Sequence, residues 1–231
     1  MTNLLEHHEY FQEHFSEFYE RKVCKKNKGI FNYKHSLGEE TAQSIFYLLS
    51  GEVSLEMQNK NTESIFYSLI GPNQVFGLEV MLDKHHQKKI ISYEAIAISD
   101  VEYLVIDKEF FLSHSYLIPT TYHQLLTSIL NRQFLLEESY KMVTKPPLVK
   151  VCNALLNLIE NLGLSKHSSE GIRFPDFVTQ VFISRYVMSS ETRVISVFKQ
   201  LEKEQIIQRK PLIVFDYKSL KHYVNKQNMY T

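Results

Sequence analysis

The chain has 231 residues, of which 44% are hydrophobic, and a formal net charge of zero, so it has enough apolar side chains for two moderate cores. It has no apolar run of about 18 residues, and residues 1–20 lack a basic start followed by an apolar block, which argues against a membrane-spanning helix or a signal peptide and predicts a cytoplasmic protein. The two cysteines, Cys24 and Cys152, form no CxxC pair, which argues against a disulfide framework and against a zinc or iron–sulfur site.

The N-terminal half is dominated by short apolar runs. Aromatic side chains at helical spacing, Phe15 and Phe18 among them, predict an amphipathic helix over residues 4–19. After it, apolar and aromatic runs alternate with turn signals such as Ser50-Gly51, a pattern typical of a compact antiparallel β-domain closed as a barrel or jelly roll. The predicted strands cover residues 30–31, 44–49, 53–57, 65–70, 93–98 and 101–106.

A long helical pattern begins after residues 107–111 and continues past Val143. One stripe along it follows alternating spacings of three and four residues: Leu126, Ile129, Gln133, Leu136, Tyr140 and Val143. We interpret this stripe as the interface of a homodimer, because little chain nearby could cover it; the alternative is a helix packed on its own domain. Pro146-Pro147 then ends the helix.

The last third of the chain is basic. Residues 1–144 hold 13 Lys and Arg against 19 Asp and Glu, whereas residues 145–231 hold 13 against 7. A local excess of positive charge suits contact with phosphate. Here an amphipathic helix over 149–162 and a polar loop over 163–171 precede two further helices, 179–187 and 191–204, which a short turn separates. Two helices joined in this way predict a helix-turn-helix.

The second of these helices separates its faces clearly. Its apolar residues at helical spacing are expected to face the core: Val194, Val197, Phe198 and Leu201. Ser190 is expected to cap the helix, and the stretch 208–211 is expected to form the turn of a wing. We predict contact with double-stranded DNA through Ser190, Glu191, Thr192, Arg193, Ser196, Lys199, Arg209 and Lys210.

Several stretches resemble the Crp/Fnr family of bacterial transcription regulators: residues 45–53, 69–77, 188–201 and 206–207. The resemblance implies an α+β fold, with an N-terminal antiparallel β-roll or jelly-roll sensor domain like a cyclic nucleotide-binding domain over 1–115. It further implies a dimerisation helix over 116–145 and a winged helix-turn-helix over 146–231. A homodimer on a palindromic operator, in contact with RNA polymerase, is the expected regulator.

The sensor half departs from the family pattern. Cyclic-nucleotide binders of the family carry a Gly-Glu pair and then an Arg followed by Ser or Thr. This chain has Gly77-Leu78, with Glu79 displaced by one position, and Lys88 and Lys89 in the second region. These five residues are the predicted ligand-binding set, but lysine lacks the bidentate guanidinium of arginine, so cyclic AMP is not the expected effector. The chain resembles the PrfA-like branch, and no cofactor is predicted, since two cysteines cannot hold the family's iron–sulfur cluster.

Two other functions stay open on the sequence. Some β-barrel domains are metal-dependent enzymes, but the predicted strands contain no histidine. The N-terminal histidines His7, His8 and His14 do not form a HExxH motif, because Gln12 stands where the second histidine of that motif would be. His85-His86 falls in a polar loop. We therefore expect no enzyme. A winged helix that binds protein instead of DNA is the third interpretation.

Overall fold

The computed structural model describes residues 18–32, 44–58, 64–87, 93–117, 119–165 and 170–228. The predicted helix over 4–19 lies almost wholly outside these residues. Contacts divide the chain into two compact units, Met1–Gln133 and Phe134–Thr231.

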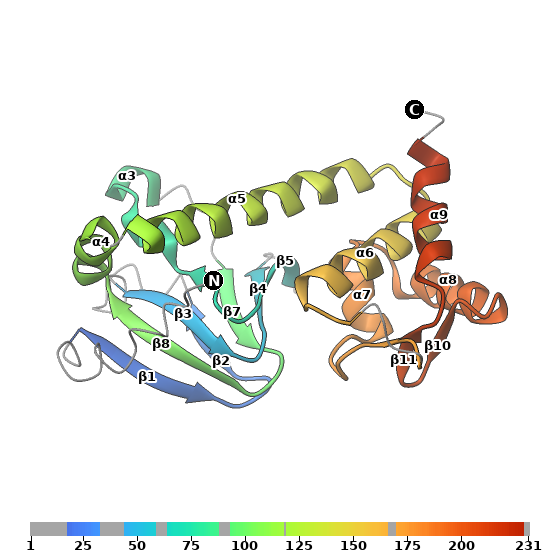
Figure 1. Cartoon of the computed structure of the whole chain (residues 1–231), viewed down its shortest axis with the longest axis horizontal. Helices are drawn as coiled ribbons and strands as arrows, with labels where there is room; N and C mark the ends of the chain where they lie inside the picture. Colours follow the sequence, from blue (N-terminus) through green and yellow to red (C-terminus); the bar gives the residue numbers. More distant parts are fainter. Residues whose placement is uncertain are drawn as a thin grey trace. The chain divides into compact units, whose positions relative to one another are not determined.

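The first unit contains two four-stranded antiparallel sheets (Figure 1). One has the order β1 (Tyr19–Cys24), β8 (Val101–Asp107), β3 (Ser44–Ser50) and β6 (Val75–Phe76). The other has the order β2 (Gly29–Asn32), β7 (Tyr93–Ala97), β4 (Val53–Gln58) and β5 (Ser64–Ile70). The predicted antiparallel β-domain is confirmed, and β1 and β6 are strands that the sequence patterns did not indicate.

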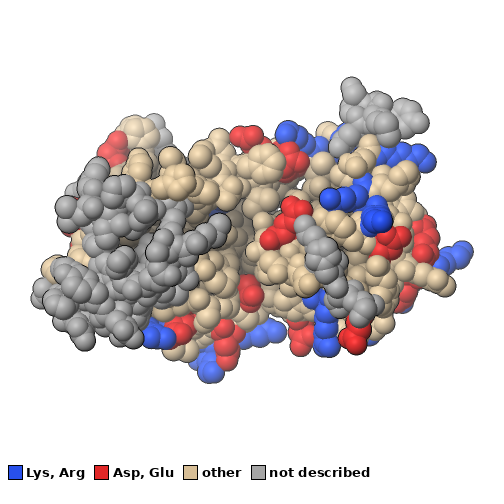
Figure 2. Space-filling view, in the orientation of Figure 1, with Lys and Arg blue, Asp and Glu red and all other residues tan. Residues whose placement is uncertain are grey.

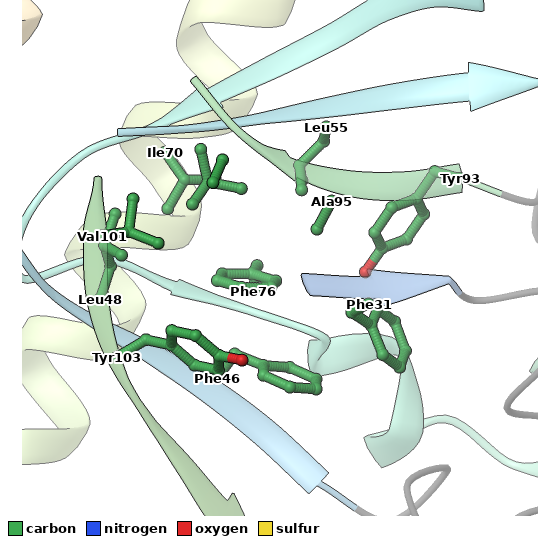
Figure 3. Packing of buried hydrophobic residues seen from close by; sticks show 12 residues of the cluster. Phe31, Phe46, Leu48, Leu55, Ile70, Phe76, Tyr93, Ala95, Val101 and Tyr103 are labelled. Atoms are coloured by element: carbon green, nitrogen blue, oxygen red, sulfur yellow. The ribbon is translucent and has the colours of Figure 1, made fainter. Parts of the chain in front are cut away.

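Side chains from both sheets form an aromatic core (Figure 3). The ring of Phe46 stacks on Phe76 with a centroid distance of 4.9 Å and lies 4.8 Å from the ring of Phe31. Strand alternation produces this core, since successive side chains point to opposite faces: in β7 the buried residues are Tyr93, Ala95 and Ala97.

The other face of the first sheet packs against helices. Ile45 and Ile106 belong to a second cluster that includes Phe111 of α4 (Lys108–Leu117) and Leu125 of α5 (Pro119–Met142). The predicted long helical segment is therefore two helices, and proline stands at the start of the second, where its missing N–H costs nothing. Helix α5 ends at Met142, so Val143 lies just beyond the helix on which it was predicted.

The second unit is a winged helix-turn-helix. Its elements are α6 (Pro147–Asn161), β9 (Ile172–Arg173), α7 (Gln180–Tyr186), α8 (Glu191–Lys203), β10 (Ile207–Arg209), β11 (Leu212–Val214) and α9 (Tyr217–Asn228). The three strands form one sheet in the order β10-β11-β9. Helix α9 packs on α6, and its Tyr223 hydroxyl donates to Glu204 at the end of α8. Neither α9 nor β9 was predicted.

The turn between α7 and α8 is held by backbone bonds. The N–H of Ser189 donates to the carbonyl of Ser184 over 2.9 Å, and the N–H of Met188 donates to that of Arg185 over 3.2 Å. Met188 adopts φ of 49°, in the left-handed region, while 61% of its surface stays exposed. A side chain that packs little is therefore held in a backbone conformation that favours glycine.

Replacing Met188 with glycine should raise the free energy of unfolding by up to about 1 kcal/mol, because the left-handed strain outweighs the extra freedom of glycine in the unfolded chain. Met188→Ala is the control, since alanine keeps the strained Cβ. Urea unfolding followed by circular dichroism measures both variants. A Met188→Gly protein less stable than the alanine variant contradicts the strain argument.

Candidate nucleic-acid interface

Helix α8 buries one side and exposes the other. Val194, Val197, Phe198 and Leu201 are buried, as predicted from their spacing. Val194 and Leu201 have no accessible surface. The predicted contact residues on this helix are all exposed: Ser190, Glu191, Thr192, Arg193, Ser196 and Lys199.

The start of α8 differs in detail from the prediction. Ser190 is the N-cap residue, and its carbonyl accepts from the N–H groups of Arg193 and Val194, but its hydroxyl makes no capping bond. The hydroxyl therefore stays available at the exposed end of the helix. In α7, by contrast, the Thr179 side chain accepts from the N–H of Phe182 over 3.1 Å.

The wing holds its two predicted cations differently. Lys210 lies in the exposed turn between β10 and β11. Arg209 is half-buried, and its Nε lies 2.5 Å from Oε2 of Glu202 on α8. This ion pair ties the wing to α8, so a DNA contact by Arg209 would have to compete with Glu202.

A hollow of about 370 Å³ lies between the wing turn and the segment that leads into α7. Its walls include Phe174, Val178 and Leu212, and its edge includes Asp176 and Lys210. The sequence did not indicate this hollow, because two segments that are distant in the sequence, 174–181 and 209–212, form it only after folding. Charges on the face shown in Figure 2 are mixed, with Lys and Arg interspersed among Asp and Glu.

The predicted ligand turn of the first unit is described in part. Gly77 has φ of 78°, and a Cβ built on it would lie 2.8 Å from the Phe46 ring, so both backbone conformation and space require glycine. Leu78 packs against the cluster around Phe111. Lys88 and Lys89 lie outside the described residues.

Glu79 is engaged by a neighbouring side chain. The hydroxyl of Tyr93 donates to Oε2 of Glu79 over 2.8 Å, and the backbone of Gly77 is near enough to lower the pKa of the same hydroxyl slightly. Burial, and secondarily the charge of Glu79, raise the pKa of Tyr93 far above its ordinary value, while Arg132 on α5 opposes this shift. Sequence reasoning missed Tyr93; its inward place on an alternating strand was the available signal, since a buried tyrosine hydroxyl needs a partner.

Helix α5 exposes a broader apolar stripe than predicted. Tyr122, Leu126, Leu130, Phe134 and Tyr140 are exposed large hydrophobic residues. Of the predicted interface, Gln133 and Val143 are also exposed, whereas Ile129 and Leu136 are half-buried. The missed residues Tyr122, Leu130 and Phe134 repeat with Leu126 at intervals of four, which places them along one side of a helix.

In the part of the chain that the structure describes, no three His, Cys, Asp or Glu side chains lie close enough together to hold a metal ion. His86 there pairs with Asp83 through a 2.6 Å contact and is exposed. His7, His8 and His14 lie outside the described residues. None of the described helices is both long enough and apolar enough to cross a membrane.

Comparison with known proteins identifies a domain in the N-terminal half. Residues 37–114 match the family model of the cyclic nucleotide-binding domain. A segment of 115 residues is 27% identical to the cyclic AMP receptor protein of Thermus thermophilus and covers 50% of this chain and 49% of that protein, so the match spans about half the length of the curated relative.

Solved structures extend the likeness to the whole fold. A cyclic nucleotide-binding domain-containing protein from Listeria monocytogenes is 20% identical, with a TM-score of 0.73 over 91% of this chain and 96% of its own. A CRP/FNR-family transcriptional regulator from Thermus thermophilus is 18% identical, with a TM-score of 0.68 over 89% and 98%. The chain therefore contains a cyclic nucleotide-binding domain within the fold of the Crp/Fnr transcription regulators, and the resemblance found in its motifs is confirmed.

Proposed function

We propose that the protein is a sequence-specific DNA-binding transcription regulator that acts as a homodimer on a palindromic operator. Residues 1–115 would form the sensor domain, 116–145 the dimerisation helix and 146–231 the DNA-binding domain. The observation that carries the proposal is the division of α8 into a buried apolar side and an exposed polar start. The Crp/Fnr fold supports it, and with it a cytoplasmic regulator that contacts RNA polymerase and catalyses no reaction.

The exposed groups at the start of α8 suit the major groove. The N-terminal residues of a recognition helix reach base edges, where hydroxyls and an arginine guanidinium can bond to bases. Arg193 is exposed in the first turn and has the reach to contact guanine in a bidentate manner. Lys199 on α8 and Lys210 in the wing are exposed cations suited to the phosphate backbone.

Replacing Arg193 with alanine should weaken binding to the preferred operator by about 10- to 100-fold and relax base selectivity at one position in each half-site. Lys203→Ala is the matched control, because Lys203 is an exposed cation in the last turn of the same helix. Competition binding against randomised operators at two salt concentrations separates a lost base contact from a lost phosphate contact, which would weaken all sequences alike.

Wild-type affinity of Arg193→Ala for every DNA would contradict the assignment of α8 as the recognition helix. Equal loss on all sequences, with a reduced salt dependence, would instead place Arg193 on the backbone.

The exposed apolar stripe of α5 supports the homodimer. A stripe that combines Leu126, Leu130 and Phe134 leaves a contiguous apolar surface in water unless a second copy covers it. Pairing of two identical helices about a twofold axis would set two DNA half-sites about one helical turn apart.

The double replacement Leu130→Asp and Phe134→Asp should convert the dimer to a monomer, because the change buries charge at the centre of the stripe. Ser139→Asp is the control, since Ser139 is an exposed position on the same helix whose spacing from Leu130 and Phe134 places it on the opposite side. Sedimentation velocity at micromolar concentration measures the state of each protein. A wild-type monomer, or a dimeric double variant, would contradict the proposed interface.

Cyclic AMP is not the proposed effector. The Glu79 carboxyl, the charged group of the ligand turn, already accepts a hydrogen bond from Tyr93. Millimolar cyclic AMP should therefore neither raise the melting temperature nor tighten DNA binding, because a ligand stabilises only the state that it binds. Calorimetry with operator DNA as the positive control decides the point, and saturable micromolar binding of cyclic AMP would overturn it.

A further inference from the structure

Tyr93 lies among the aromatic side chains of the core (Figure 3), and its hydroxyl also bonds to Glu79 of the ligand turn. It is 2% exposed and opens strand β7, with its ring centroid 6.1 Å from that of Phe31 and 6.4 Å from that of Tyr67. The aromatic packing requires only the ring. A phenylalanine would fill almost the same volume in the core, so the contribution of the hydroxyl is its hydrogen bonding and not its packing.

The hydroxyl joins β7 to the ligand turn. It donates over 2.8 Å to Glu79, which lies in the 3-10 helix η3 (Leu78–Met81), and the backbone of Gly77 at the cap of that helix lies near it. Arg132 of α5 is near enough to act electrostatically on the same group. Glu79 and Gly77 thus both belong to the turn that the sequence assigns to a ligand.

We propose that Tyr93 is a built-in ligand: its phenol occupies a latent site for a small hydroxylated aromatic molecule and holds the Gly77–Glu79 turn in place without a bound effector. The site has an apolar wall of aromatic rings and, at one end, the Glu79 carboxylate as acceptor with the backbone of Gly77 nearby. A phenolic hydroxyl, which both donates and accepts, matches these two groups.

Truncation of the side chain should expose this site to an added molecule. Tyr93→Ala removes the phenol and leaves an apolar cavity with the Glu79 carboxyl at its end and the backbone of Gly77 nearby. Benzene can refill the volume of such a cavity, but only phenol can also restore the hydrogen bond to Glu79. The proposal therefore predicts a preference for phenol that depends on Glu79.

Titration calorimetry and thermal unfolding of the full chain test this preference. The Tyr93→Ala protein should bind phenol saturably, about tenfold or more tightly than benzene, and its melting temperature should rise more with phenol than with benzene at equal occupancy. In the Tyr93→Ala, Glu79→Ala double variant, phenol and benzene should bind alike. Wild-type protein should show neither effect, because its own side chain fills the site.

A second comparison applies if Tyr93→Ala does not fold. Tyr93→Phe removes only the hydroxyl, and Tyr47→Phe is its matched control, because the Tyr47 hydroxyl donates over 2.9 Å to Asn73 in the same unit. Amide hydrogen exchange of residues 77–79 should accelerate about tenfold or more in Tyr93→Phe and stay unchanged in Tyr47→Phe.

Equal binding of phenol and benzene by a folded Tyr93→Ala protein would overturn the proposal, as would unchanged exchange at residues 77–79 in Tyr93→Phe. None of these readouts involves DNA. Their failure is therefore distinguishable from a failure of the proposed regulatory function.

Discussion

The burial of one side of α8 is the constraint on which the second unit depends. A helix of 13 residues has one side to offer to a core, and here Val194, Phe198 and Leu201 occupy it. Because these apolar residues share one side of the helix, the polar residues at the start of α8 face the solvent. The Arg209–Glu202 ion pair and the Tyr223–Glu204 bond hold the wing and α9 to the same helix. Packing thus determines which side chains this unit presents to a partner.

In the first unit, by contrast, the polar turn at Gly77 is held by side chains from inside the core. Its aromatic core reaches the glycine turn, where Phe46 leaves no room for a Cβ at Gly77. Tyr93 closes the turn from inside with its hydroxyl. The matched cyclic nucleotide-binding domain thus keeps its fold with the Tyr93 hydroxyl bonded to the Glu79 carboxyl of this turn, and membership of a domain family does not by itself establish the ligand.

The spacing of apolar residues and the residues typical of turns predicted the large elements. The alternating strands, the helix-turn-helix and the buried side of α8 were all recognisable, because each repeats a pattern over several residues. Strands β6 and β9 have two residues each, which is too short for an alternating pattern to be recognised. Helix α9 was missed because its buried apolar residues are only Leu220 and Val224 in a mainly polar segment.

The exposed apolar stripe of α5 and the contact between Tyr93 and Glu79 show a different limit. A heptad pattern identified an apolar side of α5 but not which part of it the rest of the chain covers, so Ile129 and Leu136 were included and Leu130 and Phe134 were not. The bond between Tyr93 and Glu79 joins residues 14 positions apart on different elements. Only the fold brings such groups together, so no local pattern could have indicated it.

If the protein binds DNA sequence-specifically as a symmetric dimer, selection of bound fragments from a random DNA pool, followed by footprinting of the enriched sequence, should yield a twofold-symmetric consensus. Protection is expected at two half-sites whose centres lie about 10 base pairs apart. Enrichment no greater than that of an unrelated protein, or a single asymmetric site, would contradict this mode of binding.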